Sequence, residues 1–146
     1  MLKLYQQETR YSCAPACLRM VLSAWGVEVE EAELRQLADC SPLGTDAFQL
    51  VEAARALGFT ATRKYTLASV DDLARLVDDG FFPIVYIDLW PIRGGVSGQY
   101  HSLVVLSITY ESVVVLDPLV GERSIPREDF QATWEEMRCL TILVSV

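Results

Sequence analysis

The chain has 146 residues, of which 51% are hydrophobic and 22% are charged, and this length and apolar content are typical of one globular domain, which we expect to span residues 1–146. The formal charge of −8 and the lack of any run among the 12 basic residues argue against nucleic acid as a partner. A membrane-spanning helix needs about 18 uninterrupted apolar residues, and no stretch of this chain approaches that length.

The first part of the chain carries helical patterns. Apolar residues recur at helical spacing after Cys13, which predicts a helix that starts close to this cysteine and ends at Gly26, with Ser12 at its N-cap. A second helix is expected from about Glu30 to Asp39.

A third helix, a strand and a fourth helix are expected next. The helix runs from about Asp46 to Leu57, with Thr45 as its cap, and the strand runs from Phe59 to Tyr65. Ser69 begins a capping-box pattern and opens the fourth helix, which closes at Gly80.

The second half of the chain reads as a sheet. Short runs rich in β-branched or aromatic residues predict strands at Phe82–Asp88, Ser102–Ile108, Ser112–Asp117 and Arg138–Val144. A short helix is expected to start at Pro126 and to end near Trp134. Helices first and strands later predict an α+β fold with an N-terminal helical lobe and a C-terminal antiparallel sheet lobe.

The ends and the cysteines of the chain indicate its environment. Residues Met1–Gln6 are too short and polar for a signal peptide, so we expect a cytoplasmic protein whose four cysteines are reduced. Cys13 and Cys17 are spaced like metal ligands, but no second Cys/His pair follows and the chain has one histidine. We therefore expect no metal site and no cofactor.

Cys13 is the candidate nucleophile. A cysteine at a helix N-terminus feels the partial positive charge of the helix end, which lowers the pKa of its thiol. A catalytic thiol also needs a base, and His101 is the only histidine available. The side-chain amide of Gln7, six residues before Cys13, is a candidate oxyanion donor together with the backbone N–H of Cys13, the alternative being a surface residue in a poorly ordered arm.

Asp117 is the candidate partner of the histidine. If the turn between the two middle strands centres on Thr109, His101 and Asp117 lie directly opposite each other with Cβ atoms about 4.5–5.5 Å apart. A carboxylate at this place can fix the tautomer of the imidazole. A one-residue bulge near the turn would spoil this register.

The segment from Leu89 to Tyr100 is long enough to form a flap over a cleft, although glycine-rich segments are often mere connections. Trp90, Arg93 and Gly98 are its candidate substrate-binding residues. Cys17, one helical turn after Cys13, is interpreted as a core residue, with a resolving thiol for oxidised Cys13 as the alternative.

A set of segments carries a resemblance to a known family. In chain order they are Gln7, Cys13–Leu22, Gly44-Thr45, Ala53–Gly58, Pro83-Ile84-Val85, His101 and Asp117-Pro118. In this order they resemble the bacteriocin-processing cysteine peptidases. These are papain-like enzymes that cut after a double-glycine leader and usually form the N-terminal domain of peptide-exporting ABC transporters. The resemblance covers nearly all of the chain.

The resemblance implies a papain-like fold and a thiol protease. It implies Cys13 as nucleophile, His101 as general base and then acid, Asp117 as orienting group and Gln7 as oxyanion donor. It also implies a peptide or protein as substrate and an ABC transporter as a candidate partner. The family usually has Asp-Cys-Gly where this chain has Ser12-Cys13-Ala14. The methyl group of the alanine either narrows the approach of the substrate backbone or is harmless in a helix.

Two other functions stay open beside peptide hydrolysis. The first is a domain of the same fold that binds a peptide or partner with little turnover, against which the intact set of candidate residues argues. The second is an acyl-transferase that passes the same thioester to an amine. The chain is either a stand-alone relative or a part of a transporter, and this choice determines which substrate to expect.

Overall fold

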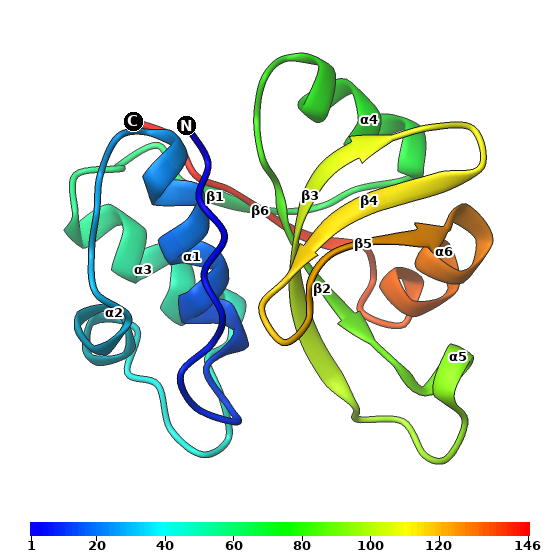
Figure 1. Cartoon of the computed structure of the whole chain (residues 1–146), viewed down its shortest axis with the longest axis horizontal. Helices are drawn as coiled ribbons and strands as arrows, with labels where there is room; N and C mark the ends of the chain where they lie inside the picture. The colour runs from blue at the N-terminus through cyan, green and yellow to red at the C-terminus, as the bar shows by residue number, and fades with distance from the viewer.

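Three helices form one lobe of the molecule. In the computed structural model, which describes residues 1–146, they are α1 (Cys13–Ala24), α2 (Glu31–Leu37) and α3 (Ala47–Ala56). Figure 1 shows them gathered on one side of the molecule, with the N-terminal segment running along them.

A six-stranded antiparallel sheet, in the order β1-β6-β2-β3-β4-β5, forms the other lobe. Its strands are β1 (Arg63–Thr66), β2 (Ile84–Asp88), β3 (Tyr100–Ile108), β4 (Ser112–Asp117), β5 (Gly121–Pro126) and β6 (Leu140–Leu143). The remaining helices, α4 (Val70–Asp78), α5 (Trp90–Arg93) and α6 (Arg127–Glu135), lie with the sheet (Figure 1). The arrangement confirms the expected α+β fold with a helical and a sheet lobe.

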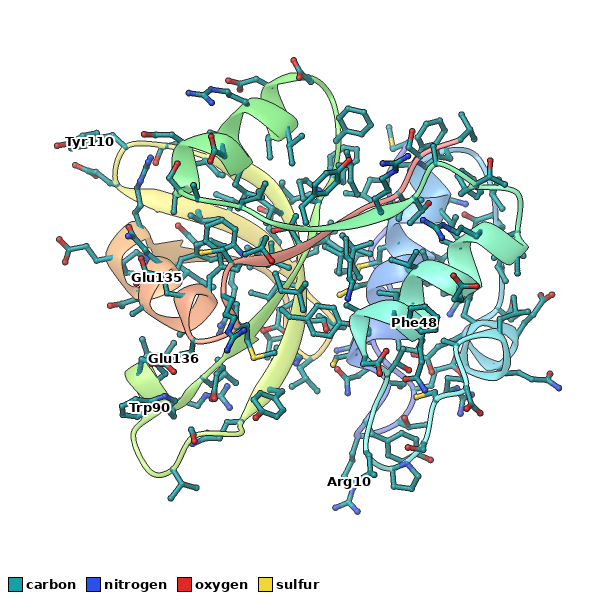
Figure 2. All side chains as sticks on the ribbon, turned by 180° about the vertical axis from the view of Figure 1, so that it is seen from behind. Arg10, Phe48, Trp90, Tyr110, Glu135 and Glu136 are labelled. Atoms are coloured by element: carbon teal, nitrogen blue, oxygen red, sulfur yellow. The ribbon has the colours of Figure 1, made fainter.

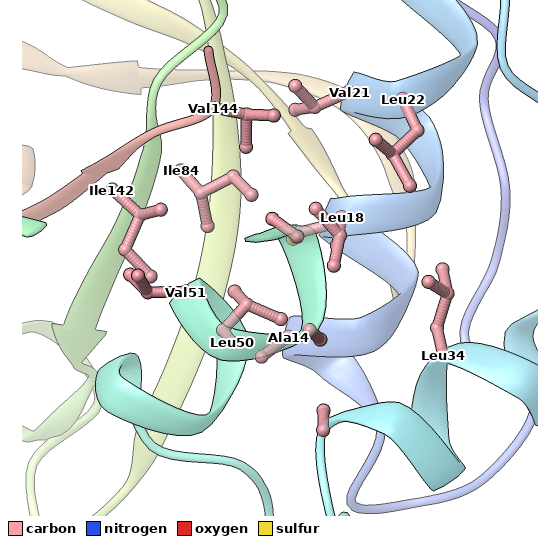
Figure 3. Packing of buried hydrophobic residues seen from close by; sticks show 14 of the residues in the cluster. Ala14, Leu18, Val21, Leu22, Leu34, Leu50, Val51, Ile84, Ile142 and Val144 are labelled. Carbon is pink, nitrogen blue, oxygen red and sulfur yellow. The ribbon is translucent and has the colours of Figure 1, made fainter. Parts of the chain in front are cut away.

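The central strands of the sheet are buried on both faces because they alternate between two hydrophobic clusters. Ile84 and Ile142 pack with Leu18 of α1 and Leu50 of α3 in the first cluster (Figure 3). Val85, the next residue of β2, belongs to a second cluster. That cluster includes Leu73 of α4 and Phe130 and Trp134 of α6. Burial on both faces explains why the strands read as continuous apolar runs.

Two helix caps differ from the sequence prediction. Ser12 occupies the N-cap position of α1 but makes no cap hydrogen bond; its Oγ accepts from the backbone N–H of Thr9 at 3.1 Å. In α3 the cap is Asp46 rather than Thr45. Asp46 and Gln49 form a reciprocal capping box with N–H to oxygen distances of 2.8 and 2.9 Å. The carboxylate of Asp46 accepts from the N–H of Gln49, and the side chain of Gln49 accepts from the N–H of Asp46, so the pair satisfies two backbone donors at the helix start.

Two strand predictions also need correction. β1 begins at Arg63, because Phe59 closes α3 through a hydrogen bond from its N–H to the carbonyl of Ala54 at 3.1 Å and lies buried against the helical lobe. β6 begins at Leu140, because Arg138 and Cys139 have φ values of 54° and 55°, which an extended strand does not allow.

The expected flap, residues 89–100, contains the short helix α5.

β5 was not predicted from the sequence, because its residues, Gly-Glu-Arg-Ser-Ile-Pro, contain no apolar run. It forms a strand because every residue from Gly121 to Pro126 pairs with β4. Backbone pairing with a rigid neighbour here outweighs weak intrinsic β-propensity.

Candidate active site

Cys13, His101 and Gln7 meet at a cleft between the two lobes. The cleft has a volume of about 590 Å³. Its walls come from the N-terminal segment, the 42–47 loop before and at the start of α3, the flap, and strands β2 and β3. Cys13 is the first residue of α1 and is half-buried, so its sulfur feels the positive end of that helix.

His101 and Asp117 are hydrogen-bonded, His101 Nε2 to Asp117 Oδ1, at 2.7 Å. The predicted register between them was wrong. Val104 pairs with Leu116 and a bulge shifts the pairing between Val105 and Ser107, so that extending the register sets Asp117 opposite Leu103. The two side chains meet along the diagonal of the strand pair, which long side chains can span.

Burial and hydrogen bonding act in opposite directions on the pKa of His101. Burial lowers it, but the hydrogen bond with Asp117 and the interactions with Cys13 raise it to about 9. Since Asp117 occupies Nε2, the other ring nitrogen, Nδ1, is the one left for the sulfur of Cys13.

The same balance acts on Cys13 and Asp117. Burial raises the pKa of the Cys13 thiol, but its interactions with His101 and Ser102 outweigh this effect, and the net pKa lies below its ordinary value. Burial also raises the pKa of Asp117, and the bonds from His101 and from the N–H of Leu119, at 2.9 Å, lower it overall. The arrangement therefore favours a thiolate–imidazolium pair beside a carboxylate.

Gln7 is held next to this pair. Its backbone N–H donates to the carbonyl of Pro118 at 2.8 Å, which ties the N-terminal segment to the turn after Asp117. Its side-chain Nε2 donates to the carbonyl of Thr9 at 2.7 Å. An amide nitrogen has two protons, so one donor remains for another acceptor.

The N-terminal segment is anchored rather than loose. The backbone N–H of Glu8 donates to the buried carboxylate of Glu31 at 3.0 Å. The carboxylate of Glu8 forms ion pairs with Arg19 and Arg35 of α1 and α2. These contacts fix the part of the chain that carries Gln7.

The flap brings Arg93 and Gly98 to the cleft but not Trp90. Arg93 and Gly98 are among the residues that line the cleft. Trp90 begins α5, which packs against α6, and Figure 2 shows its side chain near Glu136 of the α6 end. Its indole nitrogen is buried and has no hydrogen-bond partner.

Sequence reasoning missed Asp88, which anchors the flap. Its buried carboxylate accepts hydrogen bonds from the backbone N–H groups of Trp90, Gly98 and Gln99 at 3.2, 2.8 and 3.1 Å. The signal that could have identified it is an acidic residue that ends an apolar strand just before a glycine-rich segment.

Sequence reasoning also missed Ser102. Its hydroxyl lies 3.7 Å from the sulfur of Cys13. No sequence signal indicated this contact, because strict alternation sets residues 101 and 102 on opposite faces of β3.

The two departures from the usual family pattern, Ser12 and Ala14, do not line the cleft. The methyl group of Ala14 is buried in the core cluster and does not line the cleft (Figure 3). Cys17 is fully buried in the same cluster, which confirms it as a core residue, and burial raises the pKa of its thiol well above the ordinary value.

A sequence profile of the Peptidase C39 family matches residues 1–143. The chain belongs to this family. It is therefore a cysteine peptidase, and the resemblance of its sequence to the bacteriocin-processing peptidases is confirmed. None of the helices of this C39 peptidase combines the length and the apolar character that a membrane span requires.

Relatives of this C39 peptidase include a protein that is matched over most of its length and a transport protein that is matched over a small part of its length. An uncharacterized protein of Methanothermobacter marburgensis is 32% identical over 127 residues, which cover 87% of this chain and 79% of that protein. The lactococcin-G-processing and transport ATP-binding protein LagD of Lactococcus lactis subsp. lactis is 26% identical, and the match covers 92% of this chain but 18% of LagD.

Solved structures of similar fold include two peptidase domains. The peptidase domain of Streptococcus ComA, a bi-functional ABC transporter involved in a quorum-sensing pathway, has a TM-score of 0.76 and 26% identity, with full coverage of both chains. A double glycine motif protease from an AMS/PCAT transporter, solved in complex with the leader peptide, has a TM-score of 0.74 and 21% identity, covering 97% of this chain and 89% of that chain.

Proposed function

We propose that this C39 peptidase hydrolyses a peptide bond through Cys13, His101 and Asp117, with Gln7 as oxyanion donor. The observation that carries the proposal is the 2.7 Å bond between His101 and Asp117 in a cleft that also contains Cys13. The lowered pKa of Cys13 and the raised pKa of His101 are what a thiolate nucleophile and an acid for the leaving amine require.

The reaction proceeds in two steps. The thiolate of Cys13 attacks the carbonyl carbon, and the oxyanion accepts hydrogen bonds from the free proton of Gln7 Nε2 and from the backbone N–H of Cys13. The imidazolium of His101 gives its proton to the leaving amine, which leaves a thioester. Neutral His101 then takes a proton from water, and the resulting hydroxide attacks the carbonyl carbon of the thioester. This attack releases the acyl group as an acid and regenerates the Cys13 thiolate and the His101 imidazolium.

We infer that the substrate is a peptide cut after a Gly-Gly leader. The support comes from the ComA and PCAT peptidase domains and from the match to LagD. An ABC transporter is accordingly the proposed partner. The thiol must stay reduced to act, which agrees with the cytoplasmic location expected from the sequence.

The test uses purified protein and a synthetic peptide in which a Gly-Gly leader precedes a short cargo. Mass spectrometry follows the leader and the cargo as separate products. We expect cleavage after the second glycine by the wild type and none by the Cys13→Ala variant. The control is Cys40→Ala, which changes a half-buried cysteine that does not line the cleft.

Three other outcomes overturn parts of the proposal. Cleavage by Cys13→Ala at the wild-type rate excludes Cys13 as the nucleophile. Intact peptide that co-elutes with the protein indicates a binding domain with little turnover. A product joined to an added amine, in place of the free acid, indicates an acyl-transferase.

A further inference from the structure

Ser102 places a hydroxyl group beside the nucleophile from within the sheet. It is the third residue of β3 and follows His101. Its side chain is fully buried, and its Oγ lies 3.7 Å from the sulfur of Cys13. The hydroxyl thus reaches Cys13 from β3, whereas the helix dipole acts on it from α1.

The hydrogen bond between these two groups can exist in both charge states of the cysteine. With a neutral thiol, the S–H of Cys13 donates to the oxygen of Ser102. With a thiolate, the sulfur only accepts, and the hydroxyl rotates to donate. The bond to the thiolate is the stronger of the two because its acceptor is charged.

The hydroxyl of Ser102 has two neighbours that can accept its proton, the sulfur of Cys13 and the phenolic oxygen of Tyr86. Tyr86 stands directly opposite it on β2. The phenolic O–H of Tyr86 donates to the carbonyl of Thr45 at 3.0 Å, at the far wall of the cleft. The tyrosine proton is therefore committed elsewhere, and the phenolic oxygen is a neutral acceptor that competes with the sulfur for the proton of Ser102. A thiolate is a charged and stronger acceptor, so the hydroxyl turns to the sulfur when Cys13 is ionised.

We propose that Ser102 is a positioning residue that holds the sulfur of Cys13 at the end of the cleft and stabilises its thiolate by donating a hydrogen bond. This inference rests on the proposed role of Cys13 as nucleophile. It adds a second donor to the one that His101 supplies, and this donor does not titrate in the pH range of the enzyme.

The donor acts at two points of the reaction. Before attack, it raises the fraction of thiolate, and the gain is largest at low pH, where the thiolate is scarce. During deacylation the thiolate is the leaving group, and the hydroxyl stabilises the charge that returns to the sulfur. Loss of the hydroxyl therefore slows the enzyme more at pH 6 than at pH 8.

The test measures the rate of alkylation of Cys13 by iodoacetamide from pH 5 to 10, which needs no peptide substrate. Labelling is assigned to Cys13 by mass spectrometry of the digested protein. Ser102→Ala is expected to be alkylated about threefold to tenfold more slowly than the wild type at pH 6. At pH values above both thiol pKa values the two proteins react at similar rates.

Two further variants separate positioning from structure. Ser102→Thr keeps a hydroxyl on a β-branched side chain that suits a strand, and it is expected to recover most of the lost rate. Ser107→Ala removes an exposed serine from the same strand and is expected to match the wild type. Thermal unfolding of each variant checks the fold.

The outcomes are distinct for the two proposals. A wild-type Cys13 that reacts no faster than a free cysteine overturns the proposed nucleophile. A wild type with an acidic thiol and a Ser102→Ala variant with the same pH profile overturns the role of Ser102. If Ser102→Ala and Ser102→Thr are slowed equally at pH 6 while both stay folded, packing and not the hydroxyl is responsible, and the proposal fails.

Discussion

His101 and Asp117 are hydrogen-bonded at 2.7 Å across two antiparallel strands, and both side chains are buried. Asp117 is the last residue of β4, and the turn that follows it begins with Pro118. The carbonyl of Pro118 accepts a hydrogen bond from the backbone N–H of Gln7. The imidazole and the segment that carries the amide are thereby fixed against the same turn.

Replacing Asp117 is expected to destabilise the protonated form of His101. Asp117→Ala removes the carboxylate that raises the pKa of His101, so that this pKa falls from about 9 toward about 6.5. We expect a loss of about a hundredfold in kcat/KM at pH 8. Asp117→Asn keeps a hydrogen bond without the charge, so its kcat/KM should lie between those of the wild type and Asp117→Ala. Equal activity of all three proteins would contradict the role of Asp117.

The pH profile of the wild type follows from the same pair. Below the pKa of Cys13 the sulfur is protonated and cannot attack, and this limb lies at lower pH than for a free cysteine. Above pH about 9 His101 loses the proton that the leaving amine needs. A plot of kcat/KM against pH should therefore be bell-shaped, with its alkaline limb near 9. An alkaline limb near the ordinary histidine value would show that the pair is not formed.

Gln7→Ala tests the oxyanion donor. Removing one such donor lowers kcat by about 10²- to 10³-fold and changes KM little, because the oxyanion exists only after attack. Gln6→Ala is the matched control, since the amide of Gln6 donates to the carbonyl of Leu119 at 3.3 Å. Steady-state kinetics on both variants decide the matter, and equal values of kcat would exclude the role of Gln7.

Asp88→Ala tests the anchor of the flap. It leaves three backbone N–H groups without their carboxylate acceptor. We expect the free energy of unfolding to fall by about 2–3 kcal/mol. KM should rise more than kcat falls, because Arg93 and Gly98 lose their fixed place in the cleft. Urea titration and kinetics measure both effects, with Asp78→Ala, an exposed change at the end of α4, as the control.

Ala14→Gly restores the residue that the family usually has. The alanine methyl is buried in the core and not in the cleft, so kcat/KM should stay within about twofold of the wild type. The variant should lose about 1–2 kcal/mol of stability, because glycine is unfavourable in a helix and a buried methyl group is removed. A large gain in activity would show that the methyl group obstructs the substrate.

The local patterns of the sequence predicted several parts of the molecule well. Apolar spacing after Cys13 predicted α1, because a helix needs only contacts three and four residues apart. Runs of β-branched residues predicted β2, β3 and β4. The residues of the family pattern were likewise readable, since they stand in a fixed order along the chain.

The contacts between the candidate residues were decided by the tertiary structure. The turn lies at residues 109–112 rather than centring on Thr109, and a bulge between Val105 and Ser107 shifts the pairing by one residue. As a result, His101 meets Asp117 along a diagonal rather than straight across. β5 exists because β4 offers it a pairing edge.

By itself, then, the sequence determined the elements other than β5 and α5, and it determined which residue types are available for thiol chemistry. The tertiary structure alone decided that Ser102 reaches the sulfur of Cys13 and that Asp88 anchors the flap. The physical reason is that these contacts depend on the packing of α1 against β3 and on the path of an irregular loop. Neither leaves a periodic signal in the chain.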